Sequence, residues 1–324
     1  MMKRSAEVAL LAALAVSSII VGTLLGSVGL SPAEVFKSEV ARTIFFRLRF
    51  PRTLMAFITG ASLALVGSTF QSLLKNPLVD PYLIGISAGA AFGATLSLSI
   101  AEKHGYFWVL MTPILAFGFS VLSSSLAVVF SKRGKRISTG ELILAGVAMN
   151  MIFSSGTVFL LYFMRRSSQG YGVWLFGSLS GVLMKDLILP AVLLVLYLIF
   201  SLVNSRKLDA FSLGEDFAKV VGVESERLKL SFFLFGVFLT SVLVSKVGSI
   251  GFVGLIIPHL VRMIFGPAHT SSIILVALLG GSFLSYVDTF SRIIAPPLEV
   301  PIGIMTSFVG IPIFLYVMKR GGRN

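Results

Sequence analysis

The sequence predicts an all-α polytopic membrane protein with about ten transmembrane helices, organised as a single domain over residues 1–324. Apolar residues make up 56% of the chain, charged residues only 13%, and the mean hydropathy is +0.94. A soluble core cannot bury so much apolar surface. The charges lie mostly in short runs between long apolar stretches, which is typical of a chain that crosses a bilayer repeatedly.

Charge-free windows locate the predicted crossings. A helix needs about 20 apolar residues to cross a hydrocarbon layer roughly 30 Å thick, and a charge at its centre costs on the order of 3 kcal/mol. The sequence contains ten such windows, at 8–33, 53–74, 82–101, 104–131, 142–164, 187–205, 230–245, 247–261, 263–287 and 300–318. The seventh and eighth windows are short and are separated only by Lys246.

The N-terminus has two possible interpretations. Lys3 and Arg4 precede an apolar run, as in a secretory signal peptide. The charge-free stretch 8–33 is longer than the apolar region of a signal peptide, which has about 7–15 residues. We therefore expect a first transmembrane helix that is retained.

The basic residues predict the orientation. Ten crossings place both termini on one side, and the compact runs SKRGKR (131–136) and KRGGR (319–323) favour the cytoplasm for that side. The net charge of +13 then reflects cytoplasmic loops rather than a nucleic-acid surface. One basic cluster falls on the outer side against this trend and needs its own explanation: Lys37, Arg42, Arg47, Arg49 and Arg52.

Small residues recur every four positions in two of the predicted helices. One stripe consists of Gly60, Ala64 and Ser68, and the other of Gly85, Gly89 and Gly93. Such stripes let helix backbones approach closely in a membrane. We expect tight helix packing there rather than ligand binding.

Motifs for covalent chemistry are absent from the sequence. It has no GxxxxGK[ST], HExxH or GxSxG motif, and its three histidines (His104, His259 and His269) show no metal-ligand spacing. Without cysteine, disulfides, thiolate metal ligands and a cysteine nucleophile are excluded. We therefore predict no catalytic residue, no metal site and no cofactor-binding site in this chain.

The few acidic residues near the apolar windows fall at their ends. They are Glu141, Asp186, Asp288 and Glu299, and Asp288 and Arg292 are spaced to pair on one helix face. Ion-coupled transporters usually hold ionisable groups near the bilayer centre. The scarcity of such groups within the windows weighs against an ion-coupled secondary transporter that acts without an ATPase, which is the alternative interpretation. It also weighs against a membrane enzyme, the third interpretation.

The segment 212–230 is unusually charged for this chain. Five of the 14 acidic residues lie in or beside it: Asp209, Glu215, Asp216, Glu224 and Glu226. Ser212 or Gly214 is suited to start a helix whose first turn carries acids, and Gly222 is suited to end it. Phe217, Val220 and Val221 share one face. We expect a docking helix for a cytoplasmic partner, because a helix on the bilayer surface would favour Lys and Arg.

Several long motifs, in order, resemble one family. RLRFPRTLMAFITGASLALVGSTFQSLLKNPLVDPYLIGISAGAAFG (47–93) resembles an RxPR block followed by an NPLxDPxxxGxSxGA block. Further matches are STGELILAGVAMN (138–150), LGEDFAKVVGV (213–223), IGFVGLIIPHLVR (250–262) and EVPIGIMTSFVGIPIFLYVMKR (299–320). Over essentially its whole length the chain resembles the FecCD family, the permease subunits of ATP-binding-cassette importers for iron siderophores, haem and vitamin B12.

The resemblance implies a fold like that of the vitamin B12 importer permease and a transport role without enzymatic activity. It implies a second copy of the chain, two cytoplasmic ATPases that use ATP and Mg²⁺, an extracytoplasmic binding protein and a metal-chelate substrate in a lipid bilayer. We expect no bound cofactor and no nucleic acid. The expected location is a prokaryotic cytoplasmic (inner) membrane with both termini in the cytoplasm. Which chelate is carried, and whether the second subunit is identical or homologous, stays open.

The resemblance also implies roles for individual residues. Within a coupling segment of about 206–229, the ATPase would contact Leu213, Gly214, Glu215, Asp216, Phe217, Ala218, Lys219, Val220, Val221 and Gly222. In the vitamin B12 importer, arginines receive carboxylates of the binding protein, and the matching positions are Arg49, Arg52 and Arg292, with Arg42 and Arg47 as accessories. The alternative is that these arginines are solvated or face lipid headgroups. The cytoplasmic gate would be Ser138, Thr139 and Gly140, where Gly140 replaces a serine of that relative.

Overall fold

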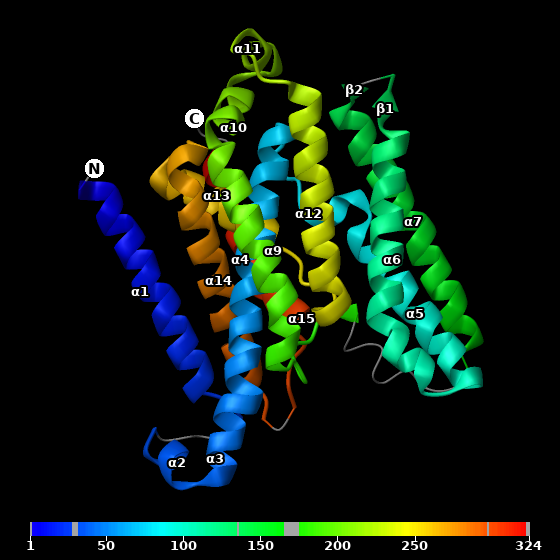
Figure 1. Ribbon diagram of the computed structural model, residues 1–324, viewed down its shortest axis with the longest axis vertical. Helices are drawn as coiled ribbons and strands as arrows, with labels where there is room; N and C mark the ends of the chain where they lie inside the picture. Colours follow the sequence, from blue (N-terminus) through cyan, green and yellow to red (C-terminus); the bar gives the residue numbers. More distant parts are fainter. Residues whose placement is uncertain (1, 28–31, 135, 165–174, 297, 322–324) are drawn as a thin grey trace. The chain divides into compact units, whose positions relative to one another are not determined.

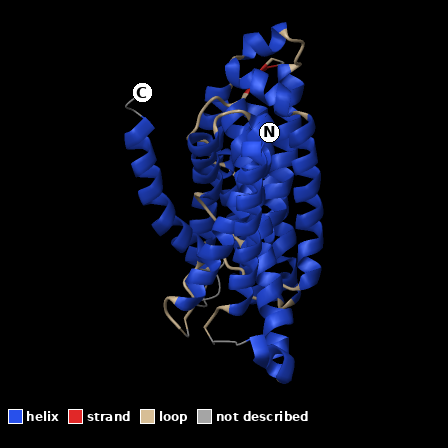
Figure 2. Ribbon diagram, turned by 90° about the vertical axis from the view of Figure 1, so that its left-hand side faces the viewer, coloured by secondary structure: helices blue, strands red, loops and turns tan. Residues whose placement is uncertain are grey.

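The structure is a computed structural model that describes residues 2–27, 32–134, 136–164, 175–296 and 298–321. Lys135 and residues 322–323 of the two basic runs, and residues 28–31 of the first predicted span, lie outside the described residues. In the described residues the regular secondary structure is helical apart from two two-residue strands, and loops join the elements (Figure 2). It divides into two compact units, each described by itself. The single domain expected from the sequence stays a prediction.

Ten helices of the described chain correspond one for one to the ten predicted spans. They are α1 (Met2–Leu24), α4 (Phe50–Leu73), α5 (Ile86–His104), α6 (Phe107–Phe130), α7 (Thr139–Phe163), α9 (Met184–Val203), α12 (Ser225–Val247), α13 (Val253–Phe265), α14 (His269–Ile293) and α15 (Ile302–Gly321). Seven helical spans are long and apolar enough to cross a membrane, and α13 and α15 are shorter apolar helices. The prediction of a polytopic all-α membrane protein is confirmed.

Unit 1 comprises Met1–Thr69, Ser178–Asp209 and Ile250–Asn324. Its centre is α14, which contacts α1, α9, α13 and α15. The short helices α2 (Pro32–Lys37) and α3 (Glu39–Thr43) and the π-helix η1 (Ile44–Arg49) lead into α4. Figure 1 shows α2 and α3 near the end of α1 that lies opposite the N-terminus.

Unit 2 comprises Phe70–Gly177 and Ala210–Ser249. In it α5, α6 and α7 pack on one another, and α12 packs on α5 and α6. A 3₁₀-helix, η2 (Pro81–Ile84), precedes α5, and the antiparallel strands β1 (Lys132–Arg133) and β2 (Arg136–Ile137) precede α7. The segment that joins α9 to α12 forms two further helices, α10 (Ser205–Leu213) and α11 (Glu215–Val220).

Both predicted small-residue stripes are packing surfaces. A side chain at Gly60 would collide with the carbonyl oxygen of Gly280 on α14. On α5, Gly89 and Gly93 lie against the backbone of α6 at Phe119 and Leu115 in the same way. Backbone contact of this kind replaces the apolar burial that drives packing in water.

Lys246 does not separate the seventh and eighth spans, contrary to the sequence prediction. It lies in the last turn of α12, where a cation is favoured by the helix dipole. The break comes afterwards, at Gly248 with φ of 72° and at Phe252 with φ of 69°. Positive φ angles at these two positions interrupt the helical backbone between α12 and α13.

Two local features differ from the expected spans. The third span starts as the separate helix η2, because Asp80 accepts a hydrogen bond from the Tyr82 amide at 2.9 Å and Pro81 occupies the first position. Gly85, with φ of 90°, then separates η2 from α5. The sixth span is followed by α10, which the sequence analysis did not predict and which buries Leu208 and Phe211.

Candidate functional site

The predicted docking helix forms as α11, Glu215–Val220. Gly214 lies at its N-cap with φ of 147°, and Glu215 and Asp216 occupy the first turn. After the helix, Gly222 has φ of 82°, and the Val223 amide donates to the Ala218 carbonyl at 2.8 Å. These local signals end the helix where the sequence indicated.

One face of α11 exposes large apolar side chains. The exposed fraction is 48% for Phe217, 85% for Val220 and 52% for Val221, and Leu213 just before the helix is 75% exposed. Ala218, on the other side, is fully buried. The helix therefore presents an apolar face away from unit 2, as expected for a helix that docks into a partner.

A buried lysine joins α11 to α12. The Nζ atom of Lys229 lies 3.1 Å from Glu215 Oε2 and 3.4 Å from Glu226 Oε1, with the Phe211 ring centroid at 5.5 Å. The lysine side chain is only 4% exposed. Partial burial raises the pKa of Glu215, but the hydrogen bond and charge of Lys229 outweigh burial and lower it below its usual value. Glu215 therefore anchors α11, whereas Phe217 and Val220 remain available for contact.

The same network reaches the predicted gate segment. Glu226 Oε2 accepts a hydrogen bond of 2.8 Å from the Ile137 amide in β2. The next residue, Ser138, is the N-cap of α7, followed by Thr139 and Gly140. A side chain at Gly140 would meet nothing within 4 Å, so packing does not require glycine there. The gate role of these three residues stays a prediction, but their position beside the Lys229 network is a structural fact.

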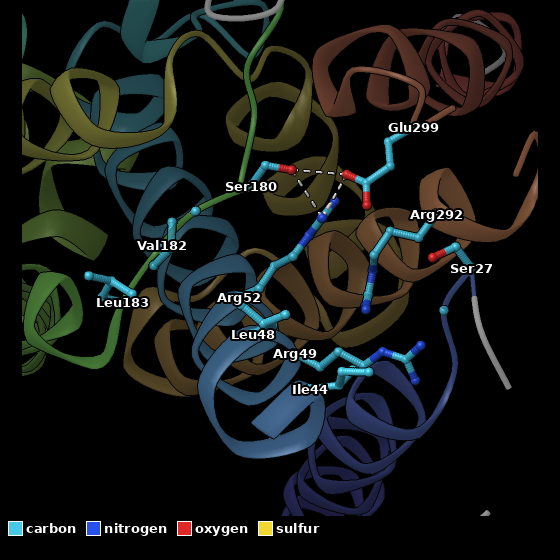
Figure 3. A pocket seen from close by; sticks show the side chains of 12 residues that line it. Ser27, Ile44, Leu48, Arg49, Arg52, Ser180, Val182, Leu183, Arg292 and Glu299 are labelled. Carbon is cyan, nitrogen blue, oxygen red and sulfur yellow. Dashed lines mark hydrogen bonds and ion pairs between the residues drawn. The ribbon is translucent and has the colours of Figure 1, made fainter. Parts of the chain in front are cut away.

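The three predicted docking arginines line one cavity of about 340 Å³ in unit 1 (Figure 3). Arg52 on α4 pairs with Asp288 of α14 at 2.9 Å and with Glu299 at 2.7 Å. Ser180 donates to the same Glu299 oxygen at 3.0 Å. Partial burial raises the pKa of Glu299, but the charge of Arg52 outweighs it and lowers the pKa.

Arg49 and Arg292 are more deeply buried than Arg52. Arg292 pairs with Asp288 at 3.2 Å, at the spacing of four residues that the sequence indicated, and it donates to the Gly22 carbonyl at 2.8 Å. Arg49 donates to the Leu24 carbonyl at 2.7 Å. Both guanidinium groups thus fasten the end of α1. The structure brings the three arginines together, and their docking role stays a prediction.

Asp209, at the end of unit 1 in α10, caps α14 from outside that helix. Its carboxylate accepts from the His269 amide at 2.5 Å and from the Thr270 amide at 3.2 Å. Partial burial raises the pKa of Asp209, but the hydrogen bonds from His269 and Thr270 lower it to about 2. Since the pKa is below its ordinary value of about 3.9, the cap stabilises fully above that pH and is lost as the pH falls toward 2.

Several of these contacts join residues far apart in the sequence. No sequence pattern predicted the pairing of Arg52 with Glu299, the capping of α14 by Asp209, or the hydrogen bond from the Ile137 amide to Glu226. Their partners are 247, 60 and 89 positions apart. Only the spacing of Glu226 and Lys229, three residues apart on one helix, offered a local signal.

Comparison with known proteins decides the family. A sequence model of the FecCD transport family matches residues 11–320. The chain belongs to this family. It is therefore a transport permease subunit of the ATP-binding-cassette importer type and a multi-pass membrane protein, and the family includes permeases for vitamin B12, haem and Fe(3+)-citrate.

The FecCD relatives are named for different transported substrates. The chain is 36% identical to the molybdate import system permease protein MolB of Haemophilus influenzae, over 88% of this chain and 84% of MolB. It is 32% identical to the cobalamin import system permease protein BtuC of Halobacterium salinarum, over 89% of this chain and 77% of BtuC. A solved structure described as an inward-facing metal-chelate type ABC transporter matches with a TM-score of 0.86 and 30% identity, covering 97% of this chain and 98% of that one.

Proposed function

We propose that this FecCD chain forms a dimeric pathway that imports a metal chelate by alternating access, driven by two partner ATPases. An extracytoplasmic binding protein delivers the chelate, and the chain catalyses no covalent step. The observation that carries the proposal is the exposed apolar face of α11, fixed to unit 2 by the buried Lys229. A short helix with such a face is suited to wedge into a partner that moves.

The Lys229 network supports a route from the ATPase to the gate. Movement of α11 pulls on Glu215, which shares Lys229 with Glu226, and Glu226 holds the β2 amide next to Ser138. Hydrogen bonds between charged side chains that are mostly buried resist breaking, because a broken bond leaves a buried charge without its partner. We propose that this link moves Ser138, Thr139 and Gly140 when the ATPases close.

On the predicted outer side of the membrane, Arg52 is suited to receive a carboxylate of the binding protein. Its side chain is 12% exposed, and its outer partner Glu299 is 35% exposed. An incoming carboxylate would compete with Glu299 for the guanidinium group. Arg49 and Arg292 then serve chiefly to hold the end of α1 in place for that contact.

The proposed cargo class is a chelate such as a ferric siderophore, haem or cobalamin. It is supported by the cobalamin name of the BtuC relative and by the metal-chelate type of the similar solved structure. The proposed location is a prokaryotic cytoplasmic (inner) membrane with both termini in the cytoplasm. In support, the N-terminal end of α1 and the C-terminal end of α15, both in unit 1, lie at the same end (Figures 1 and 2).

Reconstitution in liposomes tests the proposal. Liposomes should contain the chain with its cognate ATPase, and the cognate binding protein should be added outside together with cobalamin, haem and a ferric siderophore in turn. We expect uptake of one of them only when ATP is supplied to the ATPase. The control liposomes contain the chain without the ATPase.

Two outcomes would contradict the proposal. Uptake without the ATPase, driven by an ion gradient, would establish the secondary transporter instead. Uptake of molybdate with no uptake of any chelate would leave the ATPase-driven mechanism intact and refute the cargo class.

A further inference from the structure

Three cations on α2, α3 and η1 are not used by the transport steps proposed above, although the family resemblance made Arg42 and Arg47 accessories of the docking arginines. Lys37, Arg42 and Arg47 line one polar cavity of about 560 Å³, together with Glu39, Thr43 and Phe46. All three cationic side chains are exposed. With three cations and one carboxylate, the cavity has a formal charge of +2, so it favours an anion.

An apolar groove adjoins this polar cavity and shares Phe46 with it. The groove has a volume of about 380 Å³ and runs along the last turns of α1. Its walls are almost entirely hydrocarbon and include Ile19, Ile20 and Leu24 of α1 together with Phe36, Phe45 and Phe50. Both hollows lie within unit 1.

The positions of the two hollows along the membrane normal match the headgroup and the acyl chain of a lipid. The helical span Glu39–Leu73 has 35 residues and measures about 50 Å, against a hydrocarbon core of roughly 30 Å. If about 20 residues up to Leu73 cross the core, Arg47 lies on the order of 10 Å beyond it, in the headgroup layer. The groove starts beside Arg47 in the headgroup layer, where Phe45 and Phe46 line it, and extends along the last turns of the α1 span toward acyl-chain depth.

We propose that this pair of hollows binds one anionic phospholipid. The phosphate lies among Lys37, Arg42 and Arg47, and an acyl chain occupies the groove between α1 and η1. Arg and Lys at the membrane interface attract anionic headgroups, and each CH₂ removed from water or loose packing adds to the binding.

The side chains around the polar cavity favour a lipid over a protein or a free anion. Phe36 is 79% exposed, Val40 69% and Phe46 52%, so large apolar groups surround the cations. A free anion would gain nothing from the adjoining groove. A lipid satisfies both the charge and the apolar surface, and it explains why so basic a segment lies on the predicted outer side.

Native mass spectrometry with defined lipids tests this site. The purified full-length chain, stripped of lipid, is mixed with equal amounts of phosphatidylglycerol and phosphatidylcholine that have identical acyl chains. We expect retention of one phosphatidylglycerol, several-fold above phosphatidylcholine. The double variant Arg42→Gln, Arg47→Gln should lose this headgroup preference, and Ile20→Trp, which fills the groove, should lower retention of both lipids.

A matched variant controls for the loss of two positive charges. Lys103→Gln, Lys185→Gln removes two exposed cations away from the site and should leave lipid retention unchanged. Equal retention of the two lipids by the wild type, or displacement of the lipid by millimolar glycerol phosphate, would refute the lipid site. The same holds if the Arg42, Arg47 variant keeps its lipid but no longer captures the binding protein, because the patch is then a protein-docking surface.

Discussion

Lys229 shows how a single residue ties the docking helix to the helices of unit 2. Its side chain is almost fully buried and lies between Glu215 and Glu226. Removing one member of a buried ion pair costs about 3–5 kcal/mol, whereas neutralising all members together costs much less. Comparing a single replacement of Lys229 with neutralisation of all three residues therefore distinguishes the effect of Lys229 on stability from its effect on transmitting movement.

Replacement of Lys229 should therefore destabilise the chain. Lys229→Met should lower the free energy of unfolding by about 3 kcal/mol, because two carboxylates lose their buried cation. The triple variant that adds Glu215→Gln and Glu226→Gln should recover most of this stability but not transport. Thermal unfolding and liposome uptake measure the two effects.

The control for Lys229 is a lysine near the same aromatic ring. Lys75 lies 5.6 Å from the Phe211 centroid but is exposed, so Lys75→Met should change stability by less than about 0.5 kcal/mol. Full transport by the triple variant would contradict the transmission role of the network.

Residue pairing was predictable only where the sequence spacing is short. Asp288 and Arg292 are four positions apart on one helix, and their pairing followed from helix geometry. Arg52 meets Glu299 only because α4 and the segment after α14 fold together. No rule of sequence spacing predicts a contact across 247 positions, so the ion pair of Arg52 with Glu299 could be found only from the structure.

At the scale of elements, α11 was predictable because its signals are local. A glycine at each end, acids in the first turn and three apolar residues on one face lie within nine positions of the sequence, 214–222. By contrast, α10 was missed. Its apolar residues Leu208 and Phe211 are few and its charges resemble those of a loop, so only burial within the fold shows that it is helical.

The exposed face of α11 should dominate capture of the ATPase. Phe217→Ala with Val220→Ala removes two exposed apolar side chains and leaves the buried Ala218 and the Glu215–Lys229 pair in place, so the variant should insert normally and co-purify several-fold less ATPase. Val158→Ala with Phe159→Ala makes the same substitutions on the exposed surface of α7 and serves as the control. Equal ATPase recovery from both variants would show that α11 is not the docking element.

At the scale of the whole molecule, the positions of ten helices could be predicted because membrane insertion depends on hydropathy over about 20 residues. The ends of the helices could not, since charges are tolerated in terminal turns. Lys246 at the end of α12 is the clearest case, because its charge suggested a break that the backbone makes only at Gly248.

The predicted orientation can be tested directly because the chain has no cysteine. Single cysteines replace Asp216 in α11 and Lys103 at the end of α5, two exposed positions expected on opposite sides of the membrane. In intact cells, a membrane-impermeant maleimide should label Lys103→Cys, whereas Asp216→Cys should react only after permeabilisation. The reverse pattern would invert the topology and place α11 away from any cytoplasmic ATPase.

The glycine contacts of α4 limit how this chain can vary. Gly60 lies against the backbone of Gly280 on α14, and Gly67, seven positions on, lies against Gly254 of α13. No side chain on either partner can rotate away to admit even one methyl group. A substitution at either position therefore cannot be accommodated by repacking and must shift a whole helix. Unit 1 should thus tolerate substitutions least at these glycine positions, where helix backbones touch directly.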